Sequence, residues 1–229
     1  GAVGTIIPGV TVAIQSLENG EIIAEISGED YPTDLSSEAG EILCKGPNVM
    51  KGYWKNEEAT KEMIDNDDWL HTGDVGKFDE GFLKITDRIK HMIVNAGGKN
   101  IYPGPIEDLF KTSKWIDQIV VVGEAQNYMA GIIVPDFEVV AKFAKENGLS
   151  FSGNEELIEL EEVKDIYKKE LRTFSKELAS HEKIRDFRLV PHEFSVETGE
   201  MTPTLKVKRR VIADKYGHLI NDIFKDDKD

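Results

Sequence analysis

The stretch DRIKHMIVNAGGKNI, residues 87–101, separates two kinds of sequence and decides how the rest of the chain is interpreted. Before it lie short apolar runs broken by turn residues, and after it strand-like and helix-like runs alternate. Gly97 and Gly98 form either a tight turn or a loop whose missing side chains let a ligand pass against the backbone. The charged residues ahead of them either solvate a linker or form a hinge. The stretch alone leaves these alternatives open.

The upstream residues predict a small antiparallel β unit. Asn19-Gly20 and Asp79-Glu80-Gly81 favour hairpin or loop connections between short strands. Residues 56–63 predict a helix, because Asn56 is a good N-cap and acidic residues fill the first turn. The expected strands are Val10–Leu17, Glu21–Ser27, Gly40–Lys45 and Gly81–Thr86.

The downstream residues predict a unit in which helices and strands are mixed. Apolar residues recur at spacings of three and four between Glu155 and Glu182, which indicates a long amphipathic helix or a helix pair. The charged tail Lys225–Asp229 is expected to fray. The other expected strands are residues 116–122, 129–134 and 183–190, and the other expected helices are Pro105–Lys111, Phe137–Asn147 ended by Gly148, and Lys206–Tyr216.

Composition excludes several classes of protein. The 229 residues are 40% hydrophobic, enough for one large or two modest domains, and the net charge of −15 argues against nucleic acid or an anionic membrane as the main partner. The single cysteine, Cys44, excludes an intramolecular disulfide and a cysteine-rich zinc site, so a reducing cytoplasmic compartment fits best. No apolar run approaches the roughly 20 residues of a transmembrane segment, while peripheral membrane association stays open.

Three further clusters carry candidate chemistry. Residues 40–60 predict a strand and a glycine turn with aromatic residues packed below it. In WLHTGD, residues 69–74, Asp74 is either a turn-forming residue or a carboxylate that holds a ribose diol. Lys206 follows a Pro-Thr turn at an expected helix start, where the helix dipole disfavours a cation, which indicates an anionic partner.

In sequence and order, these four clusters resemble the later core motifs of the adenylate-forming superfamily of AMP-binding enzymes. The closest resemblance is to long-chain fatty acid CoA ligases, on AGGKNIYP (96–103), the charged stretch after Gly148 and TPTLKVKR (202–209). It covers essentially the whole chain, beginning at VGTIIPG (3–9). The implied fold class is α+β, a small antiparallel β subdomain followed by a mixed α/β C-terminal domain of the acyl-CoA synthetase type.

The resemblance implies a two-step ligase reaction. A fatty acid carboxylate attacks the α-phosphate of ATP, accompanied by Mg²⁺, to give an acyl-adenylate and pyrophosphate. The thiol of CoA then displaces AMP and leaves an acyl-CoA thioester. No metal-binding residue is expected in this chain, and its oligomeric state is not predicted.

The resemblance also implies roles for individual residues. Asp74 binds the ribose hydroxyls, and Arg88 contacts ribose or phosphate. Lys90 is the pivot between the two half-reactions, and Gly97 and Gly98 line the passage of the pantetheine arm. Lys206 is the mobile catalytic lysine that meets the carboxylate and the α-phosphate.

The implied domain boundaries are residues 1–86 for the last β-rich subdomain of a large AMP-binding domain, 87–90 for the hinge and 91–229 for the small C-terminal domain. The superfamily's Ser/Thr/Gly-rich phosphate loop and its Tyr-Gly-x-Thr-Glu segment do not occur here, so we interpret the chain as a C-terminal fragment that is inactive alone. Two alternatives stay open: an adenylating ligase for another carboxylate or for a carrier protein, and a non-catalytic interaction module.

Overall fold

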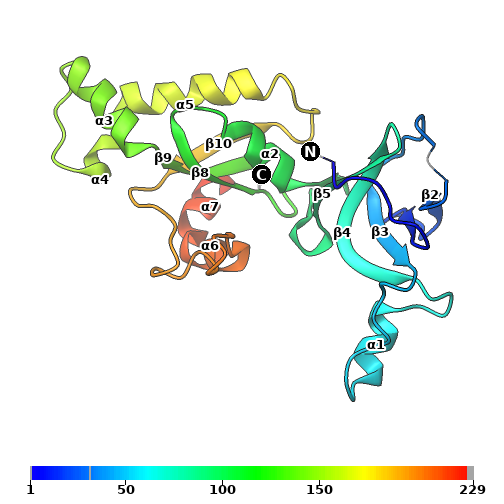
Figure 1. Ribbon diagram of the computed structural model, residues 1–229. Coiled ribbons are helices and arrows are strands. Elements are labelled where there is room, and N and C mark those ends of the chain that lie inside the picture. The colour runs from blue at the N-terminus through cyan, green and yellow to red at the C-terminus, as the bar shows by residue number, and fades with distance from the viewer. Residues whose placement is uncertain (1, 31, 226–229) are drawn as a thin grey trace. The chain divides into compact units, whose positions relative to one another are not determined.

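The computed structural model describes residues 2–30 and 32–225. The chain divides into two compact units, Gly1–His91 and Met92–Asp229, which are described separately. The first contains an antiparallel sheet and the second a mixed sheet covered by helices, which confirms the expected α+β class (Figure 1). Of the tail expected to fray, residues 226–229 lie outside the described residues.

The first unit is built on a five-stranded sheet in which every neighbouring pair is antiparallel, in the order β2-β1-β3-β4-β5. The hairpin expected at Asn19-Gly20 joins β1 to β2. The core comprises Ile6, Val10, Val12, Ile14, Ala24, Ile26, Ile42 and Phe78. The strands are β1 (Thr11–Gln15), β2 (Ile22–Ser27), β3 (Gly40–Lys45), β4 (Leu70–Asp79) and β5 (Phe82–Arg88).

The long strand β4 corrects the sequence analysis, which expected a turn around Gly73 and Asp74. Gly73 does adopt the left-handed region, with φ of +68°, but the strand continues through it because β3 and β5 pair with its two sides. Val75 and Phe78 are fully buried. Burying such side chains stabilises by roughly 1.5–3 kcal/mol each, which outweighs a local turn preference of about 1 kcal/mol.

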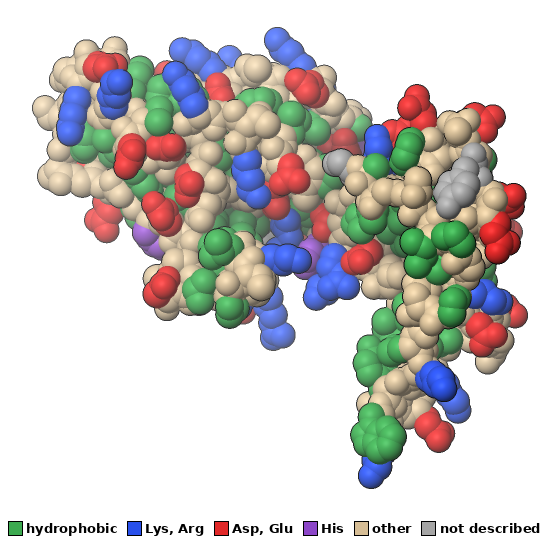
Figure 2. Space-filling model, in the orientation of Figure 1, with side chains coloured by type: hydrophobic (Ala, Val, Ile, Leu, Met, Phe, Trp, Pro, Cys, Tyr) green, Lys and Arg blue, Asp and Glu red, His purple; other side chains and the backbone are tan. Residues whose placement is uncertain are grey.

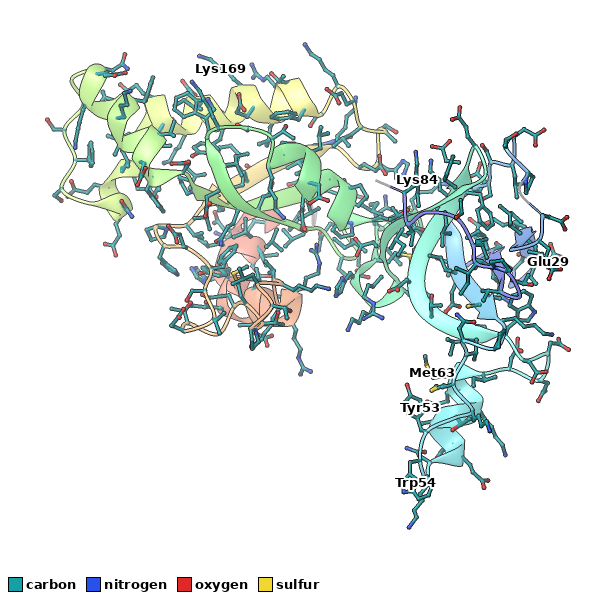
Figure 3. All side chains as sticks on the ribbon, in the orientation of Figure 1. Glu29, Tyr53, Trp54, Met63, Lys84 and Lys169 are labelled. Carbon is teal, nitrogen blue, oxygen red and sulfur yellow. The ribbon has the colours of Figure 1, made fainter. Side chains whose placement is uncertain are left out.

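The helix α1 (Glu57–Met63) forms as expected, because the Asn56 side chain accepts a hydrogen bond from the backbone N–H of Ala59. The aromatic residues ahead of it are not packed below a turn, which corrects the prediction for residues 40–60. Tyr53 is 47% exposed, and Trp54, at the tip of the segment that carries α1, is 87% exposed (Figure 3).

The second unit is built on a three-stranded sheet in the order β10-β9-β8. Strand β9 pairs antiparallel with β8 and parallel with β10. A two-stranded hairpin, β6 with β7, precedes this sheet. The strands are β6 (Ile93–Val94), β7 (Asn100–Ile101), β8 (Ile116–Val122), β9 (Met129–Pro135) and β10 (Ile184–Leu189), which matches the three strands expected downstream to within a residue or two.

Helices cover both faces of this sheet (Figure 1). Ile119 and Ile133 face one side, where they pack with residues of α2, α3, α4 and α5, and Val120 and Ile132 face the other, with α6 and α7. Lysine and acidic side chains lie along the outer face of α5, as expected of a solvated helix face (Figure 2). The helices are α2 (Pro103–Phe110), α3 (Phe137–Glu146), α4 (Asn154–Leu157), α5 (Glu161–Phe174), α6 (Arg209–Lys215) and α7 (Gly217–Ile223).

Several helix boundaries differ from the prediction. Helix α2 begins at Pro103 rather than Pro105, since the first N–H groups of a helix need no intrahelical acceptor and both prolines fit its first turn. The charged stretch forms the helix pair α4 and α5 but ends at Phe174. The C-terminal helix begins at Arg209, so Lys206 is not helical; a left-handed Leu205, with φ of +57°, ends the turn before it.

At the open edge of the sheet, two side chains of β10 cap the backbone groups of Phe187. The backbone N–H of Phe187 donates to Asp186 Oδ1 at 2.7 Å, and its carbonyl accepts from Arg188 Nη1 at 2.8 Å. These two side chains occupy hydrogen-bonding positions that a further strand would use.

Within residues 2–30 and 32–225, no helix combines the length and the apolar character needed to cross a bilayer.

Candidate functional site

Asp74 and Arg88 are brought together by the pairing of β4 with β5, where they stand directly opposite each other. Arg88 Nε donates to Asp74 Oδ1 at 2.7 Å, and the two side chains are 48% and 32% exposed respectively. Because Arg88 engages one carboxylate oxygen, the other can accept hydrogen bonds from a vicinal diol. The pair therefore offers an acceptor and a cation side by side at the surface of the first unit.

A buried carboxylate supports the backbone next to Asp74. Glu41, on β3, accepts from the N–H of Gly73 at 3.1 Å, and its other oxygen lies 3.0 Å from His71 Nδ1. Thr72 Oγ donates to the carbonyl of Ile42 at 2.7 Å. Together these bonds fix the segment 71–73 against β3.

The sequence motifs point to no role for Glu41 or His71. The available signal was a charged residue inside the run GEILC, where both sequence neighbours of Glu41 are buried. A charged side chain at such a position needs a partner, and His71 supplies it.

The end of β5 and the three residues after it form a compact turn. Asp87 Oδ1 accepts from the N–H of Arg88 at 2.7 Å and lies 3.3 Å from His91 Nδ1. Lys90 stands exposed in the 3-10 turn Ile89–His91, the last turn of the first unit.

Gly97 and Gly98 lie in the loop of the β6–β7 hairpin, and both are exposed. The loop closes through the N–H of Lys99, which donates to Asn95 Oδ1 at 2.8 Å, and the N–H of Gly98, which donates to the Asn95 carbonyl at 3.0 Å. Gly98 has a φ of +72°, and a Cβ there would meet no atom within 4 Å. The turn therefore requires the left-handed backbone at Gly98, and no other described atom of the chain occupies the space beside it.

Lys206 is exposed in a closed turn of the second unit. The N–H of Thr202 donates to the Lys206 carbonyl at 2.8 Å, and the N–H of Lys206 donates to Thr202 Oγ1 at 3.1 Å. The backbone of Lys206 is thus held within the turn while its side chain reaches solvent.

The candidate residues fall into separate groups. In the described part of the chain, an ion pair joins Asp74 to Arg88, while Lys90, the glycine pair and Lys206 each stand in a different turn. Across the same residues, no group of three His, Cys, Asp or Glu side chains could hold a metal ion.

Comparison with known proteins shows the family to which the chain belongs. Residues 90–228 match the family described as the AMP-binding enzyme C-terminal domain. The chain is 40% identical over 204 residues to long-chain-fatty-acid–CoA ligase 6 of Rattus norvegicus, a match that covers 87% of this chain and 29% of the relative. The chain thus spans less than a third of the length of that curated relative.

Two solved structures share the fold. The adenylation domain of a carboxylate reductase from Mycobacterium chelonae has a TM-score of 0.73 at 25% identity, covering 95% of this chain and 31% of that one. The corresponding domain from Segniliparus rugosus, solved with AMP and a co-purified carboxylic acid, has a TM-score of 0.70 at 25% identity, covering 96% and 32%. The chain belongs to the AMP-binding, adenylate-forming enzymes, whose C-terminal domain it carries.

Proposed function

We propose that this chain is the C-terminal part of a long-chain fatty acid CoA ligase and takes part in both of its half-reactions. The observation that carries the proposal is the 40% identity to a curated ligase of that class over 204 residues, a match too long to lie within either unit alone. The exposed Asp74–Arg88 pair and the exposed Lys206 supply the kinds of group that a nucleotide and a reacting carboxylate require.

In the first half-reaction, a carboxylate oxygen of the fatty acid forms a bond to the α-phosphorus of ATP. The bond from that phosphorus to the bridging oxygen breaks, and pyrophosphate leaves. Two anions approach each other in this step, so a cation that contacts both stabilises the transition state. One well-placed donor of this kind is typically worth about 3–4 kcal/mol, and Lys206 is the residue to which we assign it.

In the second half-reaction, the sulfur of CoA bonds to the acyl carbon and AMP leaves with the oxygen it gained. The thiol proton is released. We assign Gly97 and Gly98 to the passage of the pantetheine arm and Lys90 to the pivot that exchanges one set of groups for the other around a retained adenylate. Asp74 and Arg88 hold the nucleotide through both steps, and Mg²⁺ enters with ATP as part of the substrate.

The domain boundaries follow from these roles. Residues 1–86 complete the large domain, residues 87–90 are the hinge and residues 91–229 are the small domain. Alone, the chain is expected to turn over no substrate.

The experiment uses the full-length ligase that contains this chain, with pyrophosphate release and thioester formation measured against acids of graded chain length. We expect long-chain acids to give the highest kcat/KM with CoA as acceptor. A maximum of kcat/KM with short or aromatic acids would show that the ligase acts on another class of carboxylate.

A carrier-protein acceptor is the second candidate, since the carboxylic acid reductase from Segniliparus rugosus is also solved as an A-PCP didomain in complex with AMP, with a TM-score of 0.67 at 26% identity. Transfer to a phosphopantetheinyl carrier protein without transfer to free CoA would establish it. The absence of pyrophosphate release with every acid tested would instead favour a non-catalytic interaction module.

A further inference from the structure

The turn that carries Lys206 is closed at its base by backbone contacts. The N–H of Lys208 donates to the carbonyl of Glu200 at 2.7 Å, and Met201 forms a β-bridge with Val207. Lys208 is also the N-cap residue of α6. The two ends of the turn are therefore tied to each other and to the start of a helix.

The first end of the turn is anchored by the side chain of Glu200. This residue is completely buried, and its Oε1 accepts from Lys215 Nζ at the end of α6 and from the hydroxyl of Tyr216 at 3.3 Å. His192 Nε2 lies 2.8 Å from the same hydroxyl. The hydroxyl of Tyr216 thus lies between Glu200 and His192 and links the two side chains.

Glu200 is ionised in this setting. Burial raises the pKa of the Glu200 carboxyl, but hydrogen bonds from Lys215 and Thr198 outweigh it and lower the pKa to about 2. Its Oε2 is buried and has no hydrogen-bond partner among the described residues, so the ion pair of Oε1 with Lys215 compensates the charge. Moving the carboxylate away from Lys215 would leave a buried charge without a partner.

The second end of the turn is anchored by Arg209, the first residue of α6. Arg209 Nη2 donates to Glu107 Oε1 on α2 at 2.6 Å, and Nη1 donates to the carbonyl of Val121 on β8 at 3.2 Å. The N–H of Val121 in turn donates to Glu107 Oε1 at 2.8 Å. Helix α6 is thereby fixed to the sheet at the point where the turn enters it.

These anchors determine the position of the Lys206 backbone. Residues 203–206 are exposed, and Leu205 is in the left-handed region. The tip of the turn therefore has little packing of its own, and its position is set from its base.

We propose that Glu200 and Arg209 are positioning residues for Lys206, acting through the base of the turn rather than by contact with substrate. The inference rests on the catalytic role proposed above for Lys206. A misplacement of about 1 Å in a reacting group can lower a rate by about a hundredfold, so loosening either anchor should slow the half-reaction in which Lys206 takes part.

The test uses the full-length ligase with Glu200→Gln and Arg209→Met. Each is expected to lower the rate of pyrophosphate release by about tenfold to a hundredfold, while thioester formation from supplied acyl-adenylate stays unchanged. The matched controls are Glu197→Gln and Arg210→Met, which alter exposed residues of the same segments and should leave both rates unchanged. Equal losses in both half-reactions for Glu200→Gln and Arg209→Met would overturn the proposal.

A second arm asks whether the anchors act through Lys206. In a Lys206→Ala background, Glu200→Gln should cause no further loss of adenylation, and an additional tenfold loss would show an independent role and overturn the proposal. If Glu200→Gln folds poorly, Lys215→Met should reproduce its effect while Lys215→Arg retains activity. Equal activity of the two Lys215 variants would count against the anchor.

A third arm separates this inference from the proposed function. Hydrogen exchange at the Lys208 amide, measured in the 229-residue chain, should accelerate by at least tenfold in Glu200→Gln and stay unchanged in Glu197→Gln. Unchanged exchange in both would overturn the anchoring. Accelerated exchange in Glu200→Gln together with normal adenylation by Lys206→Ala would overturn the catalytic role of Lys206. The positioning role of Glu200 would then be wrong as well, although Glu200 would still anchor the turn.

Discussion

Arg88 Nε lies 2.7 Å from Asp74 Oδ1 across the paired strands β4 and β5, although the two residues are 14 positions apart in sequence. Each is exposed enough to meet a ligand, and one oxygen of Asp74 is left to accept from it. The same hairpin contains a second cross-strand ion pair, between Asp79 and Lys84; Lys84 is labelled in Figure 3. This second pair provides a control on the same two strands.

Asp74→Asn in the full-length ligase should weaken ATP binding about tenfold to a hundredfold, because a hydrogen bond to a charged group contributes about 1.5–3 kcal/mol. Asp79→Asn should leave ATP affinity unchanged, since Asp79 pairs with Lys84 at the far end of the hairpin. Titration calorimetry with a non-hydrolysable ATP analogue measures both. Equal affinities for the two variants would remove Asp74 from the nucleotide site.

Lys206→Ala should slow the first half-reaction by about a hundredfold to a thousandfold, which corresponds to about 3–4 kcal/mol of lost transition-state stabilisation. Conversion of supplied acyl-adenylate to thioester should be largely retained. Lys208→Ala, two residues further on and exposed, is the control. Rapid-quench kinetics measures the rate of each half-reaction. An equal decrease in both rates would contradict the role assigned to Lys206.

Lys90→Pro should block one half-reaction selectively, because proline fixes φ at the proposed pivot and removes a backbone donor. Lys90→Ala keeps the backbone free and should leave both half-reactions near their normal rates. Single-turnover kinetics of each half provide the readout. The hinge is in the wrong place if the proline variant performs both halves normally.

Gly98→Ala should lower the free energy of unfolding by about 1 kcal/mol, the approximate cost of a left-handed conformation for a residue with a Cβ. Gly97→Ala should destabilise less, since Gly97 does not have a φ in that region. If the loop also admits the pantetheine arm, Gly97→Ala should raise the KM for CoA without a matching loss of stability. Chemical denaturation together with CoA kinetics separates the turn requirement from the passage requirement.

Acid should destabilise the second unit through Glu200. Its pKa is about 2 in the folded protein against an ordinary value of 4.5, so the unfolded state takes up the proton first as the pH falls. The stability that Glu200 contributes is complete above pH 4.5 and is lost as the pH falls toward 2. Denaturant midpoints followed through Trp115, with Trp54 and Trp69 replaced by Phe, should fall less steeply over this range in Glu200→Gln than in Glu197→Gln.

The parts of the fold that were predictable from sequence are those in which the local pattern and the final environment agree. Strand β9 is a continuous apolar run that is buried along its whole length, and α3 combines an aspartate cap with a terminal glycine. Strand β4 was not predictable, because its glycine and polar residues favour a turn locally. Its strand conformation comes from pairing with β3 and β5 and from the burial of Phe78.

The candidate site shows the same division. Asp74, Arg88 and Lys206 were identified by their motifs, but the contact between the first two depends on the register of β4 and β5, which the sequence does not specify. Glu41 and Glu200 were missed as supporting residues. Each is buried against a partner far along the chain or on another element, so its importance appears only once His71 or Lys215 is placed beside it.

The capped backbone of Phe187 at the edge of β10 affects aggregation during synthesis as well as the final structure. An edge strand with free N–H and C=O groups can pair with a strand of a neighbouring molecule, including one that is newly synthesised. Asp186 and Arg188 occupy those groups at Phe187 from within the same strand, and Arg188 is itself held by Asp222 of α7 at 2.7 Å. Two ordinary surface charges thus help this sheet to remain three strands wide instead of growing into an aggregate.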